Sequence, residues 1–240
     1  MSEHDRIEDR RITRRGSLLG FGGLLAGVIA GAGSGADRSE AASDDAVGPA
    51  AVASGAVTCV LAPEQTEGPY FLAGDTVRRN VTEGKPGVPL TLRLTVVDVS
   101  TCRPIKGAAV DIWHCDAGGV YSGVSGQSSA RRFLRGIQRT DANGVAAFRT
   151  IYPGWYPGRT VHIHVKVFLG GNVVHTGQLY FPDSLTDAVY RRSPYSRRPG
   201  RDVRNTADSV FRNGGRQSML RLTKNGSGYV GAIAMGVHRS

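Results

Sequence analysis

The sequence predicts an all-β protein, an antiparallel β-sandwich with long functional loops and one short helix. Three observations predict this class. Short runs of β-branched and apolar residues alternate with polar residues at a period of two, turn residues separate the runs, and helix signals occur in one short segment. Many short strands with little helix are typical of sandwiches, in which long loops usually carry the function.

The predicted elements follow one another from residue 90 onward. The strands cover residues 90–96, 109–113, 145–151, 160–169, 173–181 and 228–237. In the first of them leucines alternate with threonines and an arginine, which indicates a half-buried strand. Residues 182–191 carry the signals of a short helix. Residues 114–135 and 192–216 show no clear period, so we expect long irregular segments there.

Two histidines on the predicted strand at 160–169 point to one face. His162 and His164 are two residues apart, and side chains at this spacing share a face of a strand. Two imidazoles on one face supply half of a metal site. If residues 170–172 form a three-residue hairpin loop, His164 lies opposite Gln178, which places Gln178 beside this site.

Two tyrosines and an arginine lie in loops that lead toward the same place. Tyr121 follows a glycine pair, Tyr156 stands in a Pro/Gly-rich turn, and Arg159 precedes His162 by three residues. Taken singly, each has an ordinary structural interpretation, as a packed aromatic, a core histidine or a salt-bridged arginine. Their joint occurrence predicts a site, and phenolate oxygens would suit a hard metal ion.

The N-terminal residues have the features of an export signal. Residues 13–19 form a twin-arginine pattern, and the apolar run at 20–32 is shorter than the ~20 residues that a membrane span needs. We expect a twin-arginine signal peptide at 1–42, a flexible linker at 43–57 and one sandwich domain at 58–240. The expected locations are the periplasm, the cell surface or the medium, without stable membrane insertion after signal cleavage.

The charge balance bears on the partners that the protein could bind, and the cysteine content bears on its disulfide bonding. Residues 1–42 hold six basic and six acidic residues, so the net charge of +10 belongs to the rest of the chain. No nucleic-acid-binding motif accompanies it, and we expect a solvated basic surface without a nucleic-acid partner. Self-association is compatible with the sequence. Outside the cytoplasm one disulfide is expected, and Cys59–Cys102 is favoured because Cys115 is expected to be buried at a strand end.

Four motifs in order resemble the intradiol ring-cleavage dioxygenases, the non-haem Fe(III) enzymes that open catechols between the two hydroxyl groups. They are VDIWHCD at 110–116, G-x-Y ending at Tyr121, PGWY ending at Tyr156, and R-x-x-H-I-H from Arg159 to His164. The resemblance covers about residues 58–212. The N-terminal helical region through which catechol-type members dimerise has no counterpart here, so that mode of assembly is not expected.

The resemblance implies a catalytic domain with assigned roles. The residues that would bind non-haem Fe(III) are Tyr121, Tyr156, His162 and His164. Arg159 and Gln178 would lie on the substrate side, and Tyr156 would leave the metal when a catechol binds and would accept a proton. The implied partners are a catechol-type small molecule and O2, and the implied product is a cis,cis-muconate-type diacid.

Two other functional interpretations of the predicted β-sandwich stay open. One is a non-catalytic transthyretin-like or carbohydrate-binding sandwich, in which the histidines are structural. The other is a copper or zinc protein that uses the H-x-H pair of His162 and His164 together with further histidine ligands.

Overall fold

The computed structural model describes residues 59–124, 131–198 and 200–239. The predicted signal peptide at 1–42 and the linker at 43–57 lie outside the described residues and stay predictions. None of the helices within the described ranges is long and apolar enough to cross a membrane.

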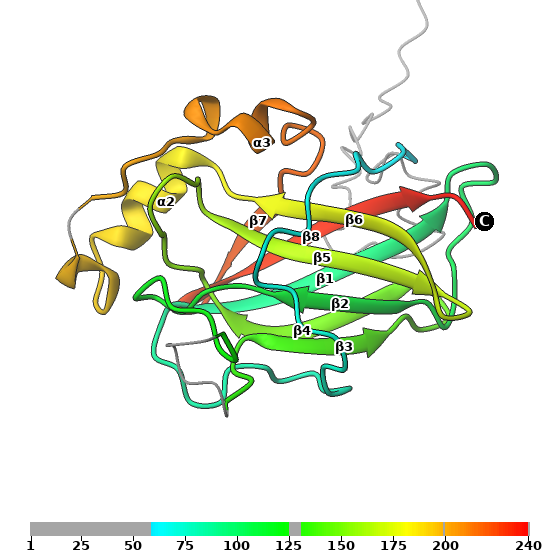
Figure 1. The fold of residues 1–240 in the computed structure, drawn as a ribbon, viewed down its shortest axis with the longest axis horizontal. Helices are drawn as coiled ribbons and strands as arrows, with labels where there is room; N and C mark the ends of the chain where they lie inside the picture. Colours follow the sequence, from blue (N-terminus) through cyan, green and yellow to red (C-terminus); the bar gives the residue numbers. More distant parts are fainter. Residues whose placement is uncertain (1–58, 125–130, 199, 240) are drawn as a thin grey trace, which may run out of the picture. The chain divides into compact units, whose positions relative to one another are not determined.

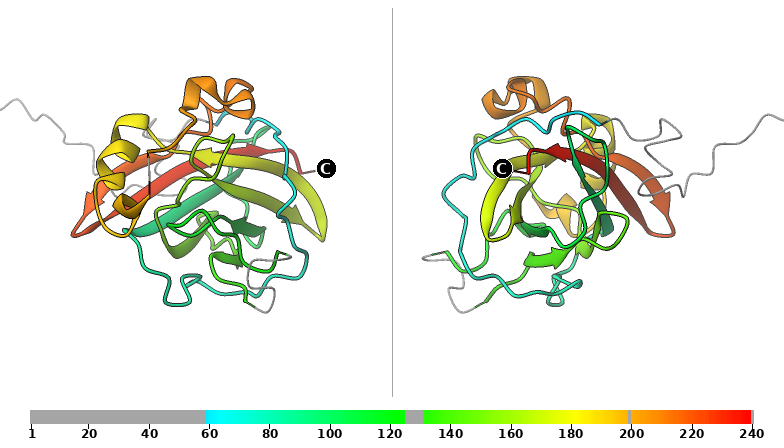
Figure 2. Two further views of the ribbon diagram at one scale, coloured as in Figure 1. Left: turned by 60° about the vertical axis from the view of Figure 1, so that its left-hand side comes forward. Right: turned by 90° about the vertical axis from the view of Figure 1, so that its right-hand side faces the viewer.

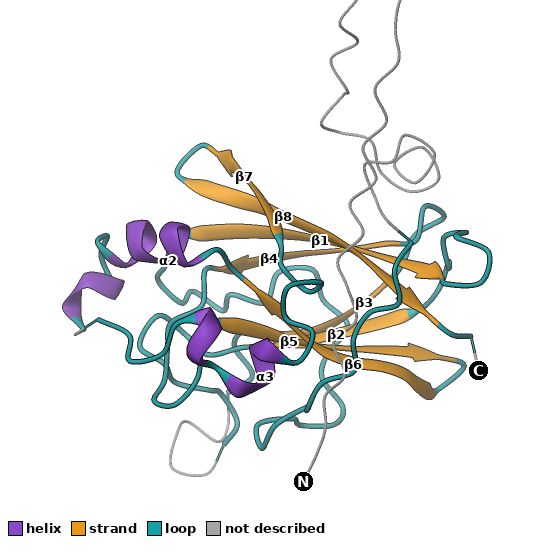
Figure 3. Ribbon diagram, turned by 90° about the horizontal axis from the view of Figure 1, so that it is seen from above, coloured by secondary structure: helices purple, strands orange, loops and turns teal. Residues whose placement is uncertain are grey.

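Eight strands of the described chain form two four-stranded sheets that pack face to face (Figures 1 and 3). The first sheet has the order β4 (Val145–Ile151), β1 (Pro89–Asp98), β8 (Gly228–Val237) and β7 (Arg221–Asn225). The second has the order β3 (Arg135–Arg139), β2 (Ala109–Trp113), β5 (His162–Leu169) and β6 (Asn172–Tyr180). The predicted all-β sandwich is confirmed. One neighbouring pair, β1 with β8, is parallel rather than antiparallel.

The hydrophobic core lies between the inner faces of the two sheets. Alternate residues of β1, including Leu90, Leu92 and Leu94, are buried there, as are Ile163 and Val165 of β5. Burial of these side chains removes apolar surface from water and is the main force that holds the sheets together. Because side chains alternate along a strand, the two histidines of β5 must lie on the outer face.

A long N-terminal segment, which we call the arm (residues 59–88), crosses the outer face of the second sheet (Figure 1). Backbone hydrogen bonds attach it at several points, among them Gln65 N to Thr176 O at 2.9 Å and Arg78 N to Ile137 O at 2.9 Å. The arm shields side chains on this face from water. For this reason β5 is buried on both faces over its first half.

The β5–β6 hairpin has the predicted register but not the predicted turn. His164 pairs with Gln178, as expected. The predicted three-residue loop at 170–172 is wrong, because the turn is the two-residue Gly170–Gly171, and both of these glycines have a positive φ. A β-bulge after Val167 shifts the ladder by one residue and restores the pairing that a longer loop would have produced.

The short helices follow β6 and gather at the end of the sandwich where β5 begins (Figures 2 and 3). Helix α2 (Asp183–Tyr190) lies in the predicted helical segment. The segment expected to be irregular contains two 3₁₀ turns, Tyr195–Arg197 and Asn205–Ala207, and the one-turn helix α3 (Ser209–Arg212). Strands β3 and β7 were not predicted, because each is five residues long and contains a single apolar side chain.

A disulfide between Cys59 and Cys102 ties the start of the arm to the turn after β1, with the Cα atoms 5.5 Å apart. Cys115 is free and buried. The favoured pairing is therefore confirmed. The bond restricts the unfolded chain by closing a loop with a sequence separation of 43 residues.

Replacing Cys59 and Cys102 together by serine is expected to lower the free energy of unfolding by about 2–5 kcal/mol, because the unfolded chain regains its freedom. Urea unfolding of the two proteins measures the difference. A thiol reductant should destabilise the wild type and leave the double variant unchanged. Equal urea midpoints for the oxidised wild type and the double variant would contradict this role of the bond.

Candidate active site

The two histidines of β5 face each other on the outer side of the sheet. The Nε2 atoms of His162 and His164 are 3.1 Å apart, and the two rings are close to perpendicular. Both side chains are buried, at 2% and 1% exposure. Burial, aided by the positive charge of Arg159, lowers the pKa of His162 to about 3. The imidazoles are therefore neutral at physiological pH.

The protonation state of His162 follows from its neighbours. Its Nδ1 lies 2.6 Å from the carbonyl oxygen of Thr160. Because a carbonyl can only accept a hydrogen bond, Nδ1 carries the proton and Nε2 presents its lone pair to His164. A carbonyl that holds the other ring nitrogen in this way is the usual partner of a metal-ligating histidine.

His164 is held between a strand neighbour and the arm. Trp113, its partner on β2, stacks on the imidazole with parallel planes and ring centres 4.8 Å apart. On the other side Gly68 of the arm, with φ +69°, approaches so closely that a Cβ there would lie 3.2 Å from Cε1 of His164. Burial and the neighbouring His162 lower the pKa of His164. Its Nδ1 is buried and has no hydrogen-bond partner among the described residues.

Two glycines let the loop after β2 touch the loop before β5. A Cβ on Gly119 would lie 2.3 Å from the carbonyl oxygen of Trp155, and a Cβ on Gly154 would lie 2.3 Å from the carbonyl oxygen of Asp116. Real Cβ atoms do not approach an oxygen this closely, so both positions require glycine. The amide of Gly154 also donates to the Asp116 carbonyl at 3.1 Å. The loops are thus joined backbone to backbone.

This contact brings Tyr121 and Tyr156 to the histidine pair. The hydroxyl of Tyr156 is 3.1 Å from Nε2 of His162, and the rings of Tyr121 and Tyr156 meet edge to face with their centres 5.6 Å apart. Burial raises the pKa of Tyr121 well above its usual value and that of Tyr156 to about 12. Tyr70 of the arm stacks on Tyr121 with ring centres 4.4 Å apart.

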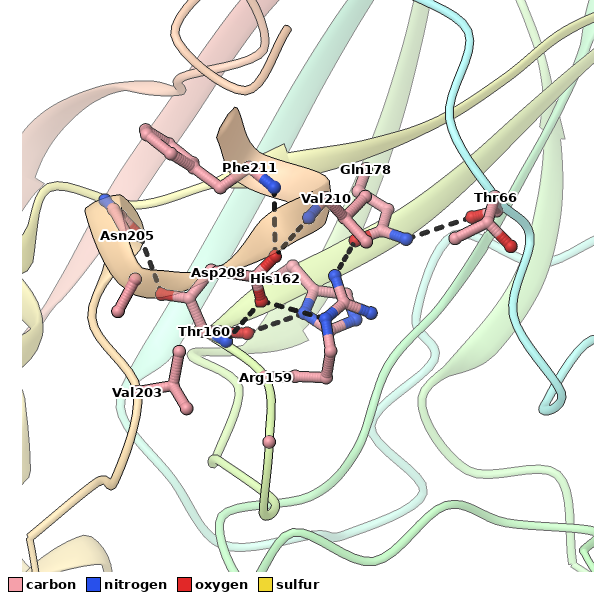
Figure 4. A network of polar contacts seen from close by, with 12 residues as sticks. Thr66, Arg159, Thr160, His162, Gln178, Val203, Asn205, Asp208, Val210 and Phe211 are labelled. Atoms are coloured by element: carbon pink, nitrogen blue, oxygen red, sulfur yellow. Dashed lines mark hydrogen bonds and ion pairs between the residues drawn. The ribbon is translucent and has the colours of Figure 1, made fainter. Parts of the chain in front are cut away.

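Arg159 and Gln178 lie at the border of this cluster and contact each other (Figure 4). Arg159 Nη2 donates to Gln178 Oε1 at 2.6 Å, and Gln178 Nε2 donates to the Thr66 carbonyl at 2.9 Å. The hydroxyl of Tyr180 also donates to Gln178 Oε1. The structure therefore brings together all six residues predicted for the site, whose individual roles stay predictions.

The donor atoms at the centre of the cluster fit a metal ion. Two ligand atoms at about 2.1 Å from one metal and at right angles to each other are about 3 Å apart. This matches the 3.1 Å that separates Nε2 of His162 from Nε2 of His164 and from the hydroxyl of Tyr156. No group of three or more His, Cys, Asp or Glu side chains in the described ranges is placed to hold a metal. A metal here would therefore need the phenol oxygens, which favour a hard ion.

Comparison with known proteins identifies the family. A family model described as Dioxygenase matches residues 66–190. An intradiol ring-cleavage dioxygenase of Tetranychus urticae is 38% identical in sequence and superposes with a TM-score of 0.72, and the match covers 75% of this chain and 96% of that one. The chain belongs to the intradiol ring-cleavage dioxygenase family.

Two curated relatives of this intradiol family member are a catechol and a chlorocatechol dioxygenase. Catechol 1,2-dioxygenase 1 of Acinetobacter lwoffii is 34% identical over an alignment of 100 positions, and the match covers 39% of this chain and 32% of that protein. Chlorocatechol 1,2-dioxygenase of Pseudomonas sp. (strain P51) is 32% identical over an alignment of 136 positions, and the match covers 48% of this chain and 53% of that protein. The matches thus span about a third to a half of the length of these relatives. Family membership favours a dioxygenase over a binding sandwich or a copper or zinc protein.

Replacing Gly119 by alanine is expected to separate the two loops and to weaken metal binding. Gly107, in a turn remote from the site, is the matched control, because both residues have φ near +80° but only Gly119 has a close neighbour. Each substitution should lower the free energy of unfolding by about 1–2 kcal/mol through backbone strain. Only Gly119→Ala should also reduce the metal bound per chain, measured by elemental analysis. Equal metal contents in the two variants would contradict the role of the loop contact.

Proposed function

We propose that this protein is a non-haem Fe(III) intradiol dioxygenase. It would add both atoms of O2 to a catechol-type aromatic diol, open the ring between the two hydroxyl-bearing carbons and release a cis,cis-muconate-type diacid. The observation that carries the proposal is the continuous set of contacts from the ring of Tyr121 through Tyr156 and His162 to His164. Family membership and the similarity to catechol and chlorocatechol dioxygenases support it.

Four side chains would hold the iron. Two neutral imidazoles and two phenolates give a donor set that suits a hard trivalent ion, and binding requires that both phenols lose their protons. When bound, ferric iron would supply Lewis acidity and a path for electrons between the catechol and O2. Nε2 of His162 is the lone-pair donor of its ring, because Nδ1 donates to the Thr160 carbonyl.

The two tyrosines are suited to different roles. Tyr121 is 2% exposed and is covered by Tyr70, so it is held in place. Tyr156 lies in a Pro/Gly-rich loop and is only partly buried. Burial raises its pKa to about 12 in the metal-free protein, so its phenolate, once released from a metal, would readily take up a proton. We therefore assign to Tyr156 the movement away from the iron and the acceptance of a proton from the catechol.

Arg159 and Gln178 would act on the substrate. The guanidinium of Arg159 is largely shielded, with 19% of its side chain exposed, so its charge acts in a medium of low dielectric. A positive group fixed in this position stabilises negative charge that develops on the catechol ring. The hydrogen bond from Arg159 to Gln178 Oε1 leaves the two side chains aligned along one side of the site.

We also propose that the protein is exported through the twin-arginine pathway. The disulfide between Cys59 and Cys102 supports this location, because structural disulfides form and persist in oxidising compartments. The pattern at residues 13–19 supports the route. Transport of the folded chain would allow iron to be inserted before export.

Metal analysis together with oxygen uptake tests the proposed activity. We expect about one iron per chain, a broad visible absorption band from the tyrosinate ligands, and O2 consumption when catechol is added. A protein that stays colourless, free of iron and inactive after ferric reconstitution would overturn the proposal. Stoichiometric copper or zinc would instead support the H-x-H metalloprotein, and metal-free binding of unchanged catechol would support the binding sandwich.

Replacing Tyr156 by phenylalanine is expected to weaken the visible band and to lower kcat by about 100-fold or more, because a ligand and a proton acceptor are lost together. Tyr229→Phe on β8, in the other sheet, is the matched control and should retain the band and the rate. Steady-state oxygen uptake and the absorption spectrum measure both effects. Full activity of the Tyr156 variant would remove its assigned role.

A further inference from the structure

The carboxylate of Asp208 borders the candidate site but comes from a distant part of the sequence. It lies between the 3₁₀ turn Asn205–Ala207 and helix α3, in the segment that follows β6 and α2. This position is outside the part of the chain that the family model matches, residues 66–190. The side chain is fully buried, with 0% exposure. A buried carboxylate requires compensation by nearby donors.

Four N–H donors surround this carboxylate (Figure 4). Its Oδ1 accepts hydrogen bonds from the amides of Val210 at 2.8 Å and Phe211 at 2.9 Å, which begin helix α3. Its Oδ2 accepts from Nε of Arg159 and from the amide of Thr160, both at 2.8 Å. Burial raises the pKa of Asp208, but these hydrogen bonds, that of Arg159 first, leave the pKa below its usual value.

The first consequence concerns the orientation of Arg159. Its Nε is bound to Asp208 and its Nη2 to Gln178 Oε1, at 2.8 and 2.6 Å. A planar guanidinium held at two of its edges has little freedom to rotate. Its Nη1 makes no hydrogen bond to a described residue, so one donor group stays available for a substrate.

The second consequence concerns His162. The segment that follows α2 binds Thr160 at two points. The amide of Thr160 donates to Asp208, and its hydroxyl donates to Asn205 Oδ1 at 2.7 Å. The carbonyl of the same threonine accepts the proton of His162 Nδ1 at 2.6 Å. The segment that follows α2 therefore fixes the Thr160 carbonyl, which orients the imidazole of His162.

We propose that Asp208 is a positioning residue of the active site, which aligns Arg159 toward the substrate and, through Thr160, holds His162 in the orientation that binds iron. Residues 205–212 are then part of the functional unit, although they lie outside residues 66–190, the part of the chain that the family model matches. The inference rests on the proposed function, since it assigns Asp208 to the same site.

The test compares Asp208→Asn with Asp202→Asn. Asp202 comes from the same segment and accepts a hydrogen bond from the amide of Gly158 in the same loop, at 2.9 Å, without contacting Arg159 or Thr160. Asp208→Asn keeps an oxygen that can accept from the first amides of helix α3. Its NH2 group would then face the N–H donors of Arg159 and Thr160, with which it cannot form these hydrogen bonds. Asp208→Ser, which preserves a good helix start, is the second variant.

We expect kcat to fall about 10–100-fold in both Asp208 variants, with a smaller change in KM, because Arg159 acts on charge that develops during the reaction. We also expect iron to be lost to a ferric chelator about 10-fold faster, followed by the decay of the visible band. Asp202→Asn should stay within about twofold of the wild type in both measurements. In an Arg159→Gln background, Asp208→Asn should lower kcat much less, since the two residues act as a pair.

The outcomes separate this inference from the proposed function. A wild-type protein without iron and without oxygen uptake would overturn the proposed function. Active, iron-loaded wild type together with Asp208 variants that match Asp202→Asn in rate and in iron release would overturn the positioning role alone. Failure of both Asp208 variants to fold, judged by circular dichroism, would assign Asp208 to the fold and would likewise overturn that role.

Discussion

The candidate site depends on a backbone-to-backbone contact between two loops. Gly119 and Gly154 lie so close to carbonyl oxygens of the opposite loop that any side chain would separate them. This contact carries Tyr121 and Tyr156 to the same place, where the second phenol meets Nε2 of His162. Without it, the two phenols would be a pair of unrelated loop aromatics, and the histidines of β5 would be half of a metal site.

The sandwich and its arm supply the rest of the environment. Because β5 buries its apolar side chains in the core, its two histidines project from the outer face, and the arm then covers that face. Trp113 and Gly68 enclose His164 from two sides, and burial keeps both imidazoles neutral. The segment that follows α2 borders the site through Asp208, which accepts hydrogen bonds from Arg159 and Thr160. The result is a shielded group of imidazole nitrogens and phenol oxygens with the guanidinium of Arg159 at its border.

Local patterns predicted the parts of this structure that depend on local geometry. Alternation along a strand placed His162 and His164 on one face, and hairpin pairing placed Gln178 opposite His164. Strands β3 and β7 have too few apolar residues to produce a pattern, and each is an edge strand that forms by pairing with a single neighbour, β2 or β8. Asp208 lay beyond prediction for another reason. It is 49 residues from Arg159, and the contact between them depends on how an irregular segment folds back over the site.

The most direct test of the central claim is a crystal structure of the protein loaded with ferric iron, with the metal located by its anomalous scattering at the iron edge. The account predicts a single iron bound by the phenol oxygens of Tyr121 and Tyr156 and by Nε2 of His162 and His164. An iron that binds elsewhere on the chain, or that contacts the histidines while both tyrosines stay protonated and apart from it, would contradict the account.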